Sequence, residues 1–341
     1  MKGVSIIICC YNSASRISRT LSHIANQKSV ENINFELIIV DNASTDDTAN
    51  ICQDYLKQTK VNFKVVYQPV PGLSAARMMG VENARFDLIL FCDDDNFLDE
   101  HYIFEGEKVL RSDEEIMLLG GIGEPDFEDI KPKWFEEYTL NFACGLVPNA
   151  KSAAVSYVDE AYGAGLFIRK DFFTFLEKIK FRSILSGRKG TSLMSGDDTE
   201  YCLIANFVGF KIAINPKLTF KHLMPVGRMN LEYLKKLHFG FGRTRLYIQV
   251  YQYVFSNDQM PDVNLKHPLW KDKLSYKRRE LIRFYLKIWF LALNEKNLDV
   301  ILQYEALKGE IEELKSLKNR YSAIFQEIFL LKKSIEKFKQ D

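Results

Sequence analysis

The sequence lacks the features that mark several large classes of protein. Its 6 Cys form no CxxC pair, and its 5 His do not stand near them at metal-ligand spacing, so no zinc site is predicted. No stretch approaches the ~18 consecutive apolar residues of a membrane-spanning helix. The apolar run at Val4–Cys10 is short, and Tyr11-Asn12 follow it rather than a small-residue cleavage site. We therefore expect a cytoplasmic protein with reduced thiols.

A net charge of one sign is missing as well, because 46 Lys and Arg nearly cancel 45 Asp and Glu. The chain as a whole therefore does not predict nucleic-acid binding. The signs are nevertheless distributed unevenly. Residues 1–225 hold 24 basic and 31 acidic residues, a net of −7, whereas residues 226–341 hold 22 and 14, a net of +8. This asymmetry favours cation handling in the first part and anion or membrane-surface contact in the second, although a solvated basic tail explains the second equally well.

Short apolar runs alternate with helical periods through the first ninety residues. The runs predict buried parallel strands at Val4–Cys10, Phe35–Val40, Phe63–Tyr67 and Leu88–Cys92. This βαβαβαβ order predicts an α/β fold, with a Rossmann-like, mostly parallel sheet covered by helices on both faces. Almost everything beyond residue 230 has a helical period. We therefore expect one domain over residues 1–225 and a C-terminal helical region over residues 226–341.

Polar residues follow three of these strands, at the sheet edge where such folds bind ligands. They are Tyr11-Asn12, Asp41-Asn42 and Asp93-Asp94-Asp95. Three adjacent carboxylates repel one another unless a cation keeps them ionised together. The hard cations Mg²⁺ and Mn²⁺ accept oxygen ligands and bridge phosphates, so we expect one of them here. An acidic turn that only caps a helix is the structural alternative.

Five segments, in order, resemble inverting family 2 glycosyltransferases with the GT-A fold: Val4–Asn12, Ile39–Asp46, Pro71–Arg77, Asp93–Asp95 and Gly196–Glu200. The resemblance covers about residues 1–225. It implies Mn²⁺ or Mg²⁺ and a nucleotide-diphospho-sugar donor, most commonly a UDP-sugar, with GDP and dTDP open. It also implies a saccharide or lipid-linked acceptor in surface polysaccharide or glycoconjugate assembly. The QxxRW motif of processive synthases is absent, which favours the transfer of a single sugar.

The resemblance also assigns roles to single residues in nucleotide-sugar binding. Asp41 is similar to the aspartate that binds the base, and Arg77 to the arginine near the diphosphate, whose geometry suits a guanidinium. Asp93 and Asp95 resemble the two ends of the DxD motif, with Asp95 as the metal ligand and Asp93 at the ribose or a metal-bound water. The full expected set is Tyr11, Asn12, Asp41, Arg77, Asp93, Asp94 and Asp95.

Asp198 is similar to the catalytic base of the family. Inversion needs one displacement at the anomeric carbon, during which a carboxylate takes the proton of the acceptor hydroxyl. Many relatives have Glu where this chain has Asp197, which either tunes its neighbour or caps the following helix. His222 begins a pattern, HxxPxxR, in which the histidine completes the metal site with Asp93 and Asp95 and Arg228 meets phosphate. A purely structural histidine is equally open.

Weaker indications concern the acceptor and the C-terminal helices. Trp134 suits the apolar face of a sugar, and Gly165 permits close backbone approach, although core packing and a tight turn explain them too. One stripe of charge comprises Lys273, Lys277, Glu280, Arg283 and Lys287, opposite Ile282, Tyr285, Trp289 and Leu293. The pattern favours packing of the apolar side on a neighbouring helix, with peripheral contact at the inner face of a membrane as the alternative.

Two other functions compete with glycosyl transfer. A sugar nucleotidyltransferase needs a Gly-rich phosphate loop after the first strand, and Cys10–Ser15 contains no Gly. A catalytically silent scaffold or binding subunit would have no need to keep Asp93, Asp95, Asp198 and His222 together. Hydrolysis of a donor with added metal would separate an enzyme from such a scaffold.

Overall fold

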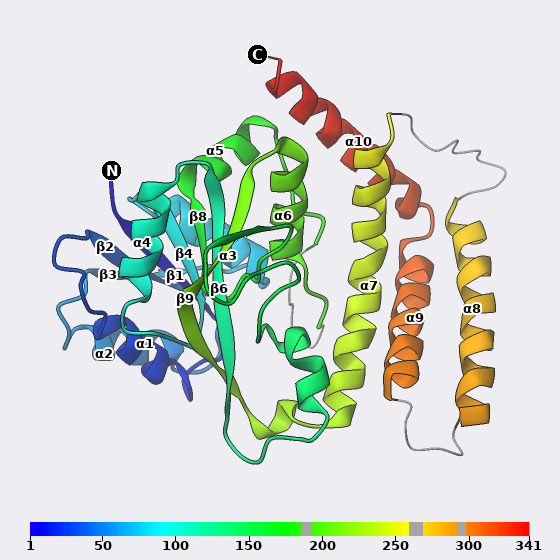
Figure 1. Cartoon of the computed structure of the whole chain (residues 1–341), viewed down its shortest axis with the longest axis horizontal. Helices are drawn as coiled ribbons and strands as arrows, with labels where there is room; N and C mark the ends of the chain where they lie inside the picture. Colours follow the sequence, from blue (N-terminus) through cyan, green and yellow to red (C-terminus); the bar gives the residue numbers. More distant parts are fainter. Residues whose placement is uncertain (186–192, 259–268, 292–297, 341) are drawn as a thin grey trace. The chain divides into compact units, whose positions relative to one another are not determined.

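The computed structural model describes residues 1–185, 193–258, 269–291 and 298–340. The chain divides into two compact units (Figure 1). The first comprises Met1–Glu177 and Asp197–Val226, and the second comprises Lys178–Gly196 and Gly227–Asp341. The expected division into residues 1–225 and 226–341 concerns folding domains and stays a prediction.

The first unit is built on a sheet with the strand order β3-β2-β1-β4-β8-β6-β9-β5, in which β7 also pairs with β9. The strands are β1 (Val4–Cys10), β2 (Phe35–Asp41), β3 (Phe63–Tyr67), β4 (Leu88–Asp93), β5 (Asn96–Leu98), β6 (Ile116–Phe127), β7 (Ser156–Val158), β8 (Leu166–Arg169) and β9 (Lys211–Met224). The first four strands are parallel, whereas β8 is antiparallel to both β4 and β6. The expectation of a mostly parallel sheet is confirmed, and β5, β7 and β8 are the strands that pair antiparallel with their neighbours.

Helices cover both faces of this sheet because the strand residues are apolar on both sides. The helices and 3-10 turn of the unit are α1 (Ile17–Ala25), α2 (Thr48–Leu56), α3 (Leu73–Asn83), α4 (Tyr102–Ser112), η1 (Phe135–Phe142), α5 (Lys170–Lys178) and α6 (Asp197–Val208). Ile6 and Ile8 of β1 share a buried cluster with Leu21 of α1 and Leu56 of α2. Ile7 points to the opposite face, where it lies so close to Gly80 of α3 that a Cβ there would overlap it.

The second unit contains the helices α7 (Leu231–Ser256), α8 (Leu269–Leu291), α9 (Leu298–Leu317) and α10 (Arg320–Phe338). Asn230 caps α7, since its Oδ1 accepts a hydrogen bond from the backbone N–H of Tyr233 at 2.9 Å. Gly242 of α7 and Gly309 of α9 let the two backbones touch, because a Cβ at either position would overlap the other helix. Among the described residues, no helix combines the length and apolar character needed to cross a bilayer.

The expected orientation of α8 is wrong. Lys277 turns inward, where its Nζ lies 2.8 Å from a carboxylate oxygen of Glu310 on α9, while Ile282 and Tyr285 are 60% and 58% exposed. The reason is that Glu310 is fully buried and requires a cation, which helical periodicity on α8 alone does not reveal. The side chains of Lys287 and Trp289, and Leu293 as a whole, lie outside the described residues.

Candidate functional site

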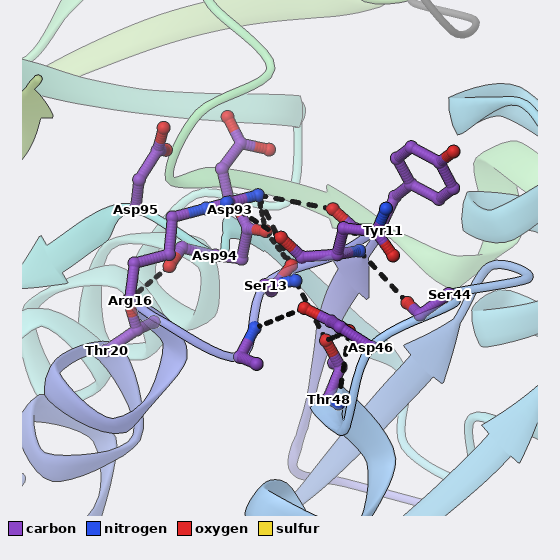
Figure 2. Close-up of polar contacts among 12 residues, drawn as sticks. Tyr11, Ser13, Arg16, Thr20, Ser44, Asp46, Thr48, Asp93, Asp94 and Asp95 are labelled. Carbon is purple, nitrogen blue, oxygen red and sulfur yellow. Dashed lines mark hydrogen bonds and ion pairs between the residues drawn. The ribbon is translucent and has the colours of Figure 1, made fainter.

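The loops that follow β1 and β2 are fastened to each other by hydrogen bonds. The backbone N–H of Asn12 donates to the hydroxyl of Ser44 at 3.1 Å, and the N–H of Thr45 donates to Oδ1 of Asn12 at 2.8 Å. The N–H of Ser44 donates in turn to Oδ1 of Asp41, also at 3.1 Å. Tyr11 is half exposed at the same edge (Figure 2). The expected nucleotide-binding residues of these two loops therefore lie together.

Asp94 points toward the loop after β1 and the start of α1 (Figure 2). Its Oδ2 accepts hydrogen bonds from the hydroxyl of Ser13 and from Nη2 of Arg16, the latter at 2.6 Å, and its carbonyl accepts one from the Thr20 hydroxyl. Burial and the neighbouring Asp95 raise the pKa of Asp94 to about 6, against the opposing charge of Arg16. Asp94 thus ties the turn after β4 to the start of α1, and a direct role in donor binding stays a prediction.

Asp93 and Asp95 point to the same side of this turn, away from Ser13 and Arg16 (Figure 2). Pairing of β5 with β9 sets Asn96 opposite His222 and so brings the imidazole beside Asp95, with 3.5 Å between Nε2 and Oδ1. The Nδ1 atom of His222 lies 2.8 Å from the carbonyl oxygen of Phe142. A carbonyl only accepts, so Nδ1 carries a proton and Nε2 is the nitrogen that faces Asp95.

The electrostatics of the Asp95–His222 pair favour charge on both partners. Burial alone would lower the pKa of His222, but the charge of the neighbouring Asp95 outweighs it and raises the pKa to about 10. Both side chains are nearly inaccessible to solvent, at 6% for Asp95 and 10% for His222. In this state the imidazolium supplies the positive charge that the carboxylate needs.

The donor set suits a divalent cation that also binds phosphate. Among the described residues, no group of three His, Cys, Asp or Glu side chains is gathered in metal-binding geometry. The expected trio of Asp93, Asp95 and His222 is thus represented by the Asp95–His222 pair, while Asp93 lies 3.8 Å from Nη2 of Arg77. Mg²⁺ needs only one or two protein ligands when water and phosphate oxygens complete its octahedron, so the pair fits such an ion provided that Nε2 of His222 gives up its proton when the ion binds.

Arg77 is buried under the site and joins two of its carboxylates. Its Nη1 donates to Oδ2 of Asp197 at 2.7 Å, and its guanidinium lies over the ring of Phe91. Burial alone would lower the pKa of Arg77, but Asp197 and Asp93 outweigh it and keep the guanidinium charged. Only 3% of Arg77 is exposed, so the side chain expected at the diphosphate lies against Asp197 in this structure.

Asp198 is held in a fixed orientation at the start of α6. Its Oδ2 accepts a hydrogen bond from the N–H of Gly163 at 2.8 Å, and its Oδ1 accepts one from the N–H of Thr199 at 2.9 Å. A Cβ at Gly163 would lie only 2.7 Å from Arg77 and 3.1 Å from the side chain of Asp198. Glycine at this position therefore allows the loop to pass between the two functional groups.

The remaining expected residues are placed differently. Gly165 has φ +66° and its carbonyl accepts from the Tyr102 hydroxyl at 2.6 Å, which accounts for a tight turn. Trp134 is half-buried against Phe135 and Phe142, with ring centroids 6.1 Å apart in both pairs. Arg228 belongs to the second unit, in the 3-10 turn η2 (Val226–Arg228). Acceptor and phosphate contacts of these residues stay predictions.

Sequence reasoning missed Ser13 and Arg16 altogether. Arg16 lies 78 residues from Asp94, and no periodicity links an arginine directly before the first helix to an acid after a distant strand. It also missed Asn42 as an organising residue, whose side chain binds the carbonyl of Val70 and the N–H of Gly72 before α3. An Asn directly after a strand end was the available signal.

The chain is similar in sequence to known glycosyltransferases. The family model "Glycosyl transferase family 2" matches residues 5–167. EpsH of Bacillus subtilis strain 168, which carries the name of a glycosyltransferase, is 36% identical over 110 residues, 32% of this chain and 30% of EpsH. The succinoglycan biosynthesis protein ExoM of Rhizobium meliloti is 22% identical over 241 residues, 71% of this chain and 73% of ExoM.

The whole chain also resembles a solved structure. TarS residues 1–349 of Staphylococcus aureus, in complex with UDP, align with a TM-score of 0.50 at 18% identity, covering 94% of this chain and 91% of that one. The chain spans only between 14% and 37% of the length of several curated relatives. Residues 5–167 of the first unit thus match the family 2 glycosyltransferases, and the sheet has the GT-A fold.

Proposed function

We propose that this protein transfers one sugar from a UDP-sugar to a hydroxyl group of a saccharide or lipid-linked acceptor, with inversion at the anomeric carbon. The observation that carries the proposal is the Asp198 carboxylate, oriented by the N–H groups of Gly163 and Thr199 within the same compact unit as Asp93 and Asp95. Family membership of residues 5–167 supports the reaction class.

The donor binds along the edge formed by the loops after β1, β2 and β4. Asp41 accepts hydrogen bonds from the nucleotide base, beside the exposed ring of Tyr11. Asp95 and His222 would hold Mn²⁺ or Mg²⁺, and Asp93 lies next to them at the ribose or a water. When bound, such a cation neutralises charge that develops on the departing diphosphate. Arg77 maintains the spacing of Asp93 and Asp197 beneath the reacting groups.

The chemical step needs one base and one displacement. The acceptor oxygen forms a bond to the anomeric carbon while its proton passes to Asp198, and the bond between that carbon and the diphosphate oxygen breaks. The nucleoside diphosphate leaves from the opposite face, so the anomeric configuration inverts. Two N–H donors orient the carboxylate of Asp198 without neutralising it, which leaves it able to accept the proton.

The choice of donor and acceptor class rests on the relatives. TarS structures include complexes with UDP and with UDP-GlcNAc, and this chain shares their fold. ExoM is named for succinoglycan biosynthesis, which favours a polysaccharide or glycoconjugate acceptor.

The test is a panel of UDP-, GDP- and dTDP-sugars incubated with the purified protein, with Mn²⁺, with Mg²⁺ and with excess chelator. We expect slow release of UDP from one or a few UDP-sugars, abolished by chelator and by Asp95→Ala. Full activity in chelator would contradict the metal role of Asp95. Binding of a UDP-sugar without hydrolysis or transfer under any condition would instead favour a silent binding subunit.

A further inference from the structure

The face of α8 that its helical neighbours leave open carries large apolar side chains. Ile282, Tyr285 and Leu286 are 60%, 58% and 50% exposed, and their spacing of three and four residues makes them neighbours on the helix surface. We call these three residues the apolar patch. Single exposed apolar residues are ordinary, but a contiguous group of them marks a contact surface.

A basic pocket of about 410 Å³ lies at the N-terminal end of the same helix. It is lined by Trp270, Lys271, Leu274, Ser275, Arg278, Lys315 and Lys318. Four of these seven described residues are Lys or Arg and none is acidic, so the pocket concentrates positive potential and attracts anions. The indole N–H of Trp270 donates to Oδ1 of Asn319 at 3.2 Å, which fixes the ring at the pocket wall.

The basic pocket and the apolar patch lie on one continuous face. Lys271, Ser275, Arg278, Ile282 and Tyr285 follow one another at intervals of three or four residues along α8, so they form a single stripe. The stripe is basic toward the start of the helix and apolar toward its end. The inward-facing lysines are separate from it, since Lys277 pairs with Glu310, and Lys273 donates to Gln249 of α7 at 2.9 Å.

We propose that this stripe of α8 docks on an anionic phospholipid membrane. Lipid phosphates enter the basic pocket, and the apolar patch enters the boundary between headgroups and acyl chains, where Tyr and Trp rings are favoured. Charge complementarity selects this occupant, because a free phosphate leaves the apolar patch without a partner and a neutral surface leaves the four cations without one. Docking would place the protein at a membrane whether or not the proposed glycosyl transfer is correct.

The experiment is co-sedimentation of the full-length protein with vesicles of phosphatidylcholine alone and with vesicles containing roughly 30% phosphatidylglycerol. We expect binding only to the anionic vesicles, and weaker binding as salt is raised. Lys271→Glu with Arg278→Glu should reduce the partition coefficient by at least roughly 30-fold, because the loss of each basic residue near the surface costs about fivefold and each new carboxylate adds repulsion. Ile282→Asp with Tyr285→Ser should also reduce binding, at unchanged ionic strength.

The matched control is Lys57→Glu with Lys60→Glu, two exposed lysines of the first unit that undergo the same change in charge. This control should bind like the wild type. Equal binding to neutral and anionic vesicles, no binding by the wild type, or equal loss in the control and the α8 variants would overturn the proposal. So would binding of inorganic phosphate without binding of vesicles.

The remaining alternative is that the α8 face binds a second copy of the protein. If sedimentation velocity without lipid shows a wild-type dimer that Ile282→Asp with Tyr285→Ser converts to monomer, and vesicle binding is unaffected, the face belongs to a second copy and the proposal is wrong. If a variant is less stable than the wild type, the dependence of wild-type vesicle binding on lipid charge and on salt still tests the proposal.

Discussion

The two units of the molecule treat their buried acids differently. At the strand edge of the first unit, carboxylates outnumber cationic groups: the acids are Asp41, Asp93, Asp94, Asp95, Asp197 and Asp198, and the cations are Arg16, Arg77 and His222. Among the described residues of the second unit, both buried glutamates have cationic partners. Arg245 and Lys277 reach Glu310, and Arg243 lies 2.7 Å from Glu313.

This difference in charge balance distinguishes a candidate binding site from a structural core. A buried carboxylate with a matched cation holds helices in place and contributes little net stability, although loss of one partner is costly. A group of carboxylates with too few cations is under electrostatic strain that an external cation would relieve. Excess negative charge at the strand edge is therefore expected to favour a cationic ligand there, and the balanced pairs of the second unit are expected to be structural.

The largest effect should come from an acid of the unbalanced group. Asp198→Asn keeps the shape of the side chain but cannot accept a proton, so turnover should fall by about 10²–10⁴-fold while donor binding is nearly unchanged. Turnover and donor affinity measured together test this. Asp171→Asn, an exposed acid in the first turn of α5, is the matched control and should be silent. Near-normal turnover in Asp198→Asn would remove it as the base.

Asp197→Asn extends the same comparison. Because this acid has a cation of its own, Arg77 at 2.7 Å, its loss should lower the melting temperature more than Asp198→Asn does. Thermal melts of the two variants in parallel decide between the roles. If both melt alike and both lose turnover equally, the distinction between a paired acid and a reacting acid fails at this site.

A balanced acid of the second unit should affect stability rather than chemistry. Glu310→Gln removes the carboxylate that Lys277 and Arg245 share, while Lys277 keeps Glu280 at 2.9 Å, so the free energy of unfolding should fall by about 1–3 kcal/mol. Adding Lys277→Met should restore most of that loss, which denaturant titration would measure as coupling. Glu305→Gln, whose partner Lys308 is on the same helical turn, should cost no more than about 0.5 kcal/mol.

Nucleotide recognition should show a smaller effect. Asp41→Ala removes an acceptor at a strand end, so affinity for a nucleoside diphosphate should weaken by about tenfold while the fold persists. Calorimetry would measure this affinity for Asp41→Ala and for the control Asp47→Ala, which changes an exposed acid in the same loop region. Unchanged affinity in Asp41→Ala would take Asp41 out of the donor site.

The smallest expected effect tests whether the role of a buried acid depends on its having matched partners rather than on the unit in which it lies. Glu36 is a buried acid of the first unit that has matched partners: its Oε1 accepts from the Ser5 hydroxyl at 2.8 Å and from the N–H of Arg85 at 2.7 Å. Burial alone would raise the pKa of Glu36, but the hydrogen bonds to Arg85 and Ser5 outweigh it and lower the pKa below its usual 4.5.

A lowered pKa in the folded state means that the ionised form stabilises folding above the unfolded pKa and that this contribution disappears as pH falls. The difference in unfolding free energy between the wild type and Glu36→Gln should be about 1 kcal/mol at pH 7 and should shrink below pH ~4.5. Turnover at pH 7 should not change. A difference that grows on acidification would show that Glu36 is protonated in the folded protein.

The sequence predicted those features that depend on local pattern or on family motifs. Continuous apolar runs located β1, β2 and β4, and the acids after them could be assigned to one edge because parallel strands end together. The antiparallel β8 could not be placed, since Leu166–Arg169 carries no signal for its neighbours. The partner of Asp94 and the inward side of α8 were also hidden, because both depend on charges contributed by remote segments.

The two glycines of the α7–α9 contact have a consequence beyond close packing, since Gly242 faces the main chain of Ala306 and Gly309 faces that of Phe239. Each glycine leaves room for the main chain of the other helix at one position only, which restricts how the two helices align along their lengths. A slide of one residue would set Phe241 or Lys308 against the opposite main chain, where a side chain has no room. The two glycines therefore fix the register of α7 against α9, so that Glu310 and Glu313 lie level with their charged partners.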